Sequence, residues 1–75
     1  MISKDVYLDG VKLKRCRVIK GFSQRGLAAE AGIASSTINL LEKRGRSDGF
    51  HPQTLIKLAE ALDVEPTDLL DDIEE

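Results

Sequence analysis

A chain of 75 residues holds one domain, which buries only about 60% of the surface that its unfolded form exposes, so it has little room for a deep substrate cavity. A hydrophobic content of 41% excludes a disordered chain, and the single cysteine excludes an internal disulfide and a zinc site built from thiolates. Behind the net charge of −2, residues 1–50 carry ten Lys or Arg against five Asp or Glu, whereas residues 51–75 carry one against eight. This asymmetry indicates a nucleic-acid partner, unless the surface is an ordinary solvated one with an acidic end.

The first twenty residues are predicted to form an extended arm followed by a basic helix. Residues 1–9 alternate weakly in polarity, and Asp9-Gly10 is a turn signal. Over residues 11–20, apolar residues recur at helical spacing among Lys and Arg. We therefore expect an amphipathic basic helix that Gly21 ends.

Two further helices joined by a short turn are predicted next. Ser23 is a good N-cap for a helix over residues 24–31. Gly32 is expected to end this helix in a left-handed conformation, and a third helix is expected over residues 35–43. Two helices joined by a short turn that contains glycine form the helix-turn-helix motif.

The C-terminal part of the chain is predicted to add two more helices. A polar loop over residues 44–51 precedes a fourth helix, for which Pro52 is a suitable first residue. A turn over residues 63–65 leads to a short fifth helix that begins at Pro66. The sequence therefore predicts an all-α fold of five helices.

The chain is expected to be one domain with a short extension at each end. The arm spans residues 1–9, the helix-turn-helix domain residues 10–71, and an acidic tail residues 72–75. No apolar run approaches the roughly 20 residues that cross a bilayer, and no segment at the N-terminus resembles a signal peptide. We therefore expect a soluble protein of the cytoplasm that has no membrane partner.

The third helix has one face that must be buried and one that points outward. Ile38 and Leu41 share the buried side. The outward side carries Ser36, Asn39, Leu40 and Lys43, with Ser35 at its flank. Hydroxyl, amide and apolar groups of this size suit the major groove of DNA, where Asn can pair with adenine and an apolar group can touch the thymine methyl. The geometry alone would suit a protein interface equally well.

The residues of this region resemble the lambda-repressor-like, Cro-type helix-turn-helix family. The run Phe-Ser-Gln-x-x-Leu-Ala-x-x-x-Gly-Ile-x-x-Ser-Thr-Ile-x-x-Leu-Glu starts at Phe22, and the resemblance extends over about residues 11–70. It implies a five-helix DNA-binding domain with the helix-turn-helix at the second and third helices.

The resemblance, taken with the outward face of the third helix, also implies roles for single residues. Base-reading residues would be Ser35, Ser36, Asn39 and Leu40. Contacts with the DNA backbone would come from Gln24, Arg25, Thr37, Lys43, Arg44 and Arg46, and Arg15 is a further candidate by charge. Arg17 and Glu42 would form a partly buried ion pair between the first and third helices, unless they are independent surface charges.

A dimer interface is expected at the end of the domain, at Leu69, Leu70 and Ile73, with the arm over residues 2–8 as the alternative. Three features depart from the family pattern, and one of them is the long acidic end over residues 71–75. Ala34 stands where a capping Ser or Thr is usual, so we expect the third helix to begin at Ser35. The loop before Pro52 is longer than is common, which leaves the targets of Arg44, Arg46 and His51 open.

The sequence thus predicts sequence-specific binding of double-stranded DNA by a homodimeric transcriptional regulator of the repressor type, with the recognition helix in the major groove. The alternative is a protein-interaction module of the same fold, of the antitoxin or antirepressor type, with weak or no DNA binding. The acidic C-terminus, as a contact for a protein partner, favours that alternative. We expect no catalytic residues and no cofactor, and Cys16 and His51 are too few ligands for a metal.

Overall fold

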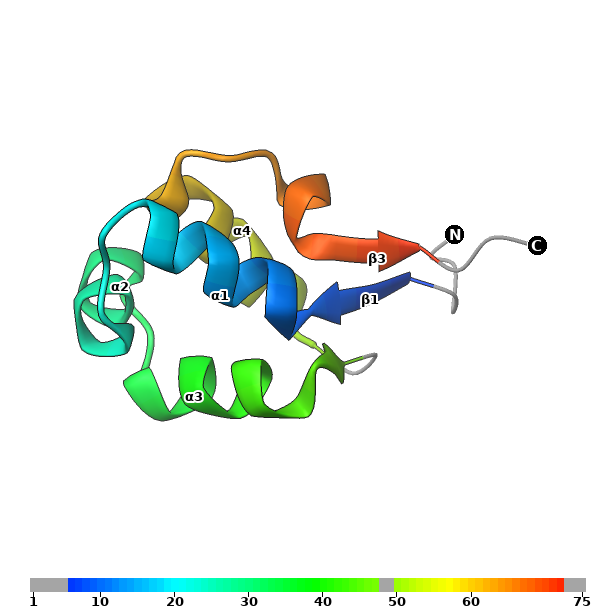
Figure 1. The fold of residues 1–75 in the computed structure, drawn as a ribbon, viewed down its shortest axis with the longest axis horizontal. Helices are drawn as coiled ribbons and strands as arrows, with labels where there is room; N and C mark the ends of the chain where they lie inside the picture. Colours follow the sequence, from blue (N-terminus) through cyan, green and yellow to red (C-terminus); the bar gives the residue numbers. More distant parts are fainter. Residues whose placement is uncertain (1–5, 48–49, 73–75) are drawn as a thin grey trace.

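Within residues 6–47 and 50–72, which the computed structural model describes, four α-helices surround the core and a small sheet closes one end (Figure 1). The helices are α1 (Gly10–Ile19), α2 (Gln24–Ala31), α3 (Ser35–Arg44) and α4 (Pro52–Leu62). A single turn of 3₁₀ helix, η1 (Pro66–Leu69), follows α4. No helix in this part of the chain combines the length and the apolar character needed to cross a membrane.

The sheet has three short strands, β1 (Val6–Asp9), β2 (Arg46–Ser47) and β3 (Leu70–Asp72), in the order β2-β1-β3. Both pairings are antiparallel, and Leu8 lies opposite Ser47 on one side and Leu70 on the other. The all-α prediction is therefore wrong, and so is the expected fifth helix, which is one 3₁₀ turn running straight into a strand. The segment expected to be an arm supplies the central strand, because Leu8 fills the core with no exposed surface.

The helix ends follow the capping chemistry of the sequence. The hydroxyl of Ser23 accepts a hydrogen bond of 2.9 Å from the N–H of Gly26, which caps α2. Gly32 ends α2 with φ +73°. Ala34 makes no side-chain cap, and α3 begins at Ser35 as expected. The turn between α2 and α3 is therefore three residues long, which sets the two helices in the helix-turn-helix arrangement.

The core is aliphatic. Its fully or almost fully buried side chains come from every helix, from η1 and from β1; they are Leu8, Leu13, Leu27, Ala28, Ile38, Leu41, Leu55, Leu58, Ala59, Leu62 and Leu69. Phe22 and Phe50 pack against its rim. Burial of each Leu or Ile contributes about 1.5–3 kcal/mol, and this core fixes α3 by its inner residues so that its other face is left to solvent.

The backbones of α1 and α3 approach closely at Gly10. A Cβ on this residue would lie well under 3.0 Å from the carbonyl oxygen of Leu41 and 3.0 Å from the Cα of Glu42. The N–H of Gly10 donates to the carbonyl oxygen of Gly45, just after α3. The first turn of α1 therefore holds the C-terminal end of α3 through backbone contacts.

Candidate nucleic-acid interface

One long face of α3 is open to solvent. Ser36, Asn39, Leu40 and Lys43 are exposed, with Leu40 at 47%, whereas Ile38 and Leu41 are buried. Ser35 and Thr37 are half-buried at the flanks. The helix runs along the lower edge of the molecule in Figure 1, with α1 and α2 above it. Three of the four side chains predicted to read bases thus share one accessible ridge with Lys43, and the fourth, Ser35, lies at its flank.

A polar network connects this ridge to α1 and α2. We use this name for the side chains of Arg17, Gln24, Asn39 and Glu42, together with the carbonyl of Phe22. Arg17 donates from Nε to Glu42 Oε2 at 2.7 Å and from Nη2 to Glu42 Oε1 at 3.1 Å. Its Nη1 donates to the carbonyl of Phe22 at 2.9 Å. The ion pair implied by the family resemblance is thus present in the structure.

The network continues to the ridge through two amides. Gln24 Nε2 donates to Glu42 Oε1 at 3.0 Å, and Asn39 Nδ2 donates to Gln24 Oε1 at 3.2 Å. Because a carboxylate can only accept, Gln24 must turn its NH₂ group to Glu42 and its oxygen to Asn39. Asn39 is therefore left with its own oxygen and one N–H for another partner. An acceptor and a donor side by side match the N6 and N7 edge of adenine.

Glu42 stays charged inside this network. Burial raises the pKa of the Glu42 carboxyl, but the hydrogen bonds from Arg17 and Gln24 and the charges of Arg17 and Lys14 lower it further, so that its pKa lies below the ordinary value of 4.5. The side chains of Arg17 and Glu42 are only 11% and 6% exposed. The pair therefore acts as a fixed, partly dehydrated anchor between α1 and α3.

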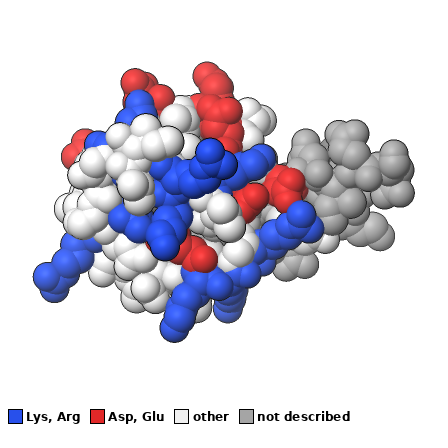
Figure 2. Space-filling view, viewed as in Figure 1, with Lys and Arg blue, Asp and Glu red and all other residues white. Residues whose placement is uncertain are grey.

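The basic side chains lie on the side of α3 and over the middle of the molecule. In Figure 2, Lys and Arg gather at the lower edge and the centre of this face, whereas acidic groups lie at the upper and left edges and also beside the basic groups near the centre. Arg25, Lys43 and Arg44 are exposed. Basic side chains thus lie beside the open side of α3 and also over α1, and both can attract a polyanion.

Arg46 has a partner in its own domain. Its Nη2 lies 2.7 Å from Asp71 Oδ2, and its guanidinium lies over the ring of Tyr7 at 5.9 Å. Arg46 is in β2 and Asp71 in β3, on the two sides of β1. The Asp71 carboxylate therefore offsets the charge that Arg46 would offer to a phosphate.

A shallow pocket of about 190 Å³ separates α3 from the start of α4. Two of the predicted backbone-contacting residues, Thr37 and Arg44, line it. His51 and Thr54 line its other side, at the N-terminus of α4. The hydroxyl of Ser47, also in the lining, is buried and has no hydrogen-bond partner in the described part of the chain. A helix N-terminus with hydroxyl and guanidinium groups is a suitable setting for a phosphate. Thr54 was missed from the sequence, although its place in the first turn after Pro52 could have indicated it.

Of the residues predicted for the dimer interface, Leu69 is buried within its own domain. This side chain has no exposed surface, because η1 folds back against α4 and inserts it into the core. Leu70 is half-buried and its backbone pairs with Leu8 in the sheet. Ile73 and residues 2–5 of the alternative arm lie outside the described residues, and Leu8 of that arm is buried.

Residues 13–69 match the sequence profile of the helix-turn-helix family. Among solved structures, the restriction-modification controller protein C.AhdI from Aeromonas hydrophila is 37% identical over 80% of this chain and 88% of that one, with a TM-score of 0.72. The master regulator for biofilm formation SinR, of Bacillus subtilis, was solved in complex with DNA. It is 33% identical over 80% of this chain and 94% of that one, with a TM-score of 0.74. A chain in the complex of the SinR and SinI proteins is 33% identical over 80% of this chain and 57% of that one, with a TM-score of 0.73. No curated protein sequence matches the chain.

Proposed function

Because the chain belongs to the helix-turn-helix family, we propose that it is a transcriptional regulator of the repressor type that binds double-stranded DNA in a sequence-specific manner. The observation that carries this proposal is the exposed ridge of α3, on which Asn39 is oriented by hydrogen bonds that begin at a buried ion pair. Side chains that are oriented before binding lose less entropy when the complex forms. The similarity to SinR, which was solved with DNA, supports the same conclusion.

We propose that α3 enters the major groove and that phosphates are held on both sides of it. Base edges would be read by Ser35, Ser36, Asn39 and Leu40. On one side of α3, the DNA backbone would be contacted by Gln24, Arg25 and Lys43. On the other side it would be contacted by the pocket that contains Thr37 and Arg44. Arg46 would contribute less, since Asp71 already neutralises it. Such contacts release counterions, so the affinity should fall steeply with salt.

We propose that the protein acts as a homodimer, because one reading head of this size contacts few base pairs. Two heads would bind half-sites about one helical turn, roughly 34 Å, apart. Of the residues predicted for the interface, Leu70 at the edge strand β3 remains a candidate within the described chain. We also propose that the chain is a cytoplasmic binding protein and not an enzyme, as the regulators it resembles indicate.

The proposal predicts different effects for base-reading and phosphate-contacting residues. Ser36→Ala and Leu40→Ala should each cost about 1–3 kcal/mol on the preferred duplex and relax the preference at one base position. Arg25→Gln should instead weaken binding to all duplexes alike and reduce the salt dependence by about one phosphate contact. Selection from a random duplex pool, followed by titration at several salt concentrations, measures both. If the Ser36 and Leu40 variants kept their affinity and their preference, the ridge of α3 would not be the recognition surface.

A protein-interaction role is the second candidate. The observation that favours it is the similarity to the complex between SinR and SinI, in which a regulator of this kind is bound by another protein. The acidic end of the domain, with Glu65, Asp68 and Asp71 in its described part, would be the contact surface in this case. Binding to no duplex in the random pool at low salt would favour this candidate over DNA recognition.

A further inference from the structure

The outward face of α1 is unusually apolar for a solvent-exposed surface. Val11, Val18 and Ile19 are 59%, 58% and 76% exposed, and they make up three of the five large hydrophobic side chains that are exposed in the described chain. They are spaced seven and eight residues apart, so they lie on the same side of the helix. The opposite side of α1 is already used, because Leu13 is buried in the core.

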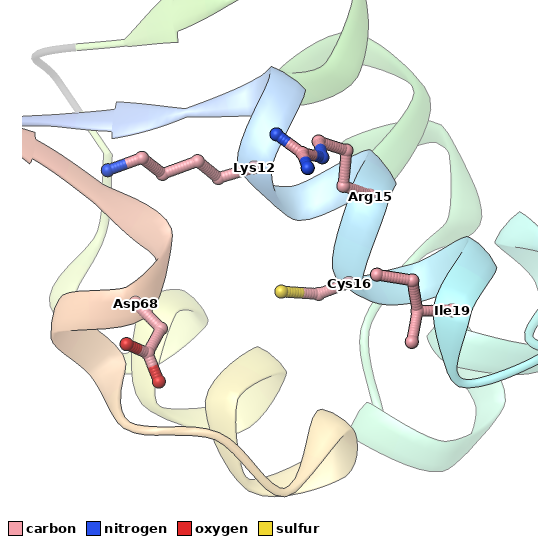
Figure 3. A pocket seen from close by; sticks show the side chains of 5 residues that line it. All are labelled: Lys12, Arg15, Cys16, Ile19 and Asp68. Carbon is pink, nitrogen blue, oxygen red and sulfur yellow. The ribbon is translucent and has the colours of Figure 1, made fainter.

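Two shallow, open hollows lie along this face. One, of about 220 Å³, lies between α1 and η1, and Figure 3 shows Cys16 and Ile19 facing Asp68 across it, with Lys12 and Arg15 on the helix above. The other, of about 270 Å³, is lined by Lys14, Arg15, Val18 and Ile19. Arg15 and Ile19 line both hollows, so the two adjoin along the helix. We call this surface the α1 groove.

The charged side chains that α1 contributes to the groove are all positive. The sequence of α1, GVKLKRCRVI, contains no acidic residue. Lys14 and Arg15 lie between Val11 and Val18 on the exposed side, and neither forms an ion pair within the described residues. Lys12 is held by a hydrogen bond of 2.8 Å from its Nζ to the carbonyl of Leu70. The groove thus offers two cations between apolar ends on α1, and the carboxylate of Asp68 lies across from the helix on η1.

We propose that the α1 groove binds an acidic amphipathic helix of a partner protein. The complementary helix would carry apolar side chains at positions i, i+7 and i+8 and carboxylates at i+3 and i+4. Such a helix buries its apolar side chains against Val11, Val18 and Ile19 and pairs its carboxylates with Lys14 and Arg15. The ten residues of α1 span about 15 Å, which is enough for two turns of a partner helix.

The same features disfavour other occupants. A second copy that docked α1 against α1 around a two-fold axis would place Lys14 and Arg15 against their own counterparts. DNA phosphates would meet the cations but leave the three aliphatic side chains uncovered. Moreover, α1 crosses the front of the molecule in Figure 1, whereas α3 runs along its lower edge. Three short aliphatic side chains without an aromatic residue, on a helix packed into a domain, make a weak membrane anchor.

The experiment titrates the full chain, labelled with ¹⁵N, with a synthetic helical peptide that has Leu at i, i+7 and i+8 and Glu at i+3 and i+4. A peptide of equal composition and scrambled order is the control ligand. We expect the ordered peptide to shift the amide resonances of residues 11–19 and the scrambled one to leave them unchanged. The double variant Lys14→Glu with Ile19→Ser should bind the ordered peptide at least tenfold more weakly. The double variant Lys57→Glu with Ile56→Ser, which makes the same chemical changes on the exposed side of α4, should bind it like the original chain.

Several outcomes would overturn the proposal. Equal binding of both peptides, or resonance shifts centred on α3, would show that the α1 groove is not selective. A loss of duplex binding in the Lys14 and Ile19 variant would assign the surface to DNA, and a loss of dimers in sedimentation would assign it to a second copy. Binding to phosphatidylglycerol vesicles that depends on these two residues would assign it to a membrane. Duplex binding of the original chain is measured in a separate titration. If the proposed DNA function failed, the peptide titration would therefore still test the α1 groove.

Discussion

Replacing Glu42 by alanine is expected to lower the free energy of unfolding by about 3–5 kcal/mol, which is a large part of the stability of a small domain. The variant leaves Arg17 with a charge that is only 11% exposed and has lost both of its bonds to the carboxylate. Gln24 loses its acceptor as well, so the orientation of Asn39 on the ridge of α3 is lost with it. Urea unfolding followed by circular dichroism measures the first effect, and duplex titration of the remaining folded protein measures the second.

Two control variants separate this effect from a general loss of charge. Asp71→Ala removes the partner of Arg46, whose side chain is 59% exposed, and should cost less than about 1 kcal/mol. Arg17→Met combined with Glu42→Leu removes both buried charges, and it should recover much of the stability lost in Glu42→Ala. Equal losses for Glu42→Ala and Asp71→Ala would contradict the role of a dehydrated anchor.

The contribution of Glu42 should also depend on pH. The pKa of this carboxyl is lower in the folded chain than its ordinary value of 4.5, so the unfolded chain takes up a proton first as the pH falls. The stabilisation is therefore fully present above the unfolded pKa and is lost as the pH falls through the folded one. The difference in unfolding free energy between the original chain and Glu42→Gln should be constant near neutral pH and shrink below about pH 4.5. A difference that grew with acid would contradict the direction of the shift.

Gly10→Ala is expected to cost about 3 kcal/mol or more, at the upper end of the range for overpacking. The added Cβ meets the backbone of α3 at Leu41 and Glu42, and backbone cannot turn aside as the tip of a side chain can. Either α1 moves away from α3 or the hydrogen bond from Gly10 to Gly45 is lost. The loss should appear in thermal unfolding, together with faster hydrogen exchange at the end of α3.

Gly26→Ala is the matched control for this substitution. A Cβ at this position in α2 would lie 3.2 Å from the hydroxyl of Ser23 and 3.6 Å from the ring of Phe22, both of which are side chains that can adjust. The gain in helix propensity, about 1 kcal/mol, offsets that adjustment. We expect a change within about 1 kcal/mol, and a loss as large as that of Gly10→Ala would show that the contact with α3 is not the cause.

The helices could be predicted from local chemistry, and the sheet could not. Capping by Ser23, the left-handed Gly32 and the proline at the start of α4 each act within a few residues, so a sequence reveals them. The strands are two to four residues long, too short for an alternating pattern to be recognised. Their pairing joins segments that are distant along the chain, and burial of Leu8 decides it.

Some features of the candidate site could likewise be predicted from the sequence, and others could not. The outward face of α3 follows from helical geometry, and the pair of Arg17 with Glu42 follows from the family resemblance. The engagement of Arg46 by Asp71 could not be foreseen, because it needs the two edge strands on either side of β1. The burial of Leu69 needs the same knowledge, since a 3₁₀ turn and a helix direct this side chain differently.

The central place of β1 has a consequence for how the protein is made. This strand is synthesised first, but its neighbours Ser47 and Leu70 follow Leu8 by 39 and 62 residues. The helices can form as the chain leaves the ribosome, whereas closing the sheet over such separations is slow and waits for β3. Until then one edge of β1 has no partner strand, and an unpaired strand edge favours aggregation. A chain that stopped before β3 would therefore leave one edge of its central strand unpaired.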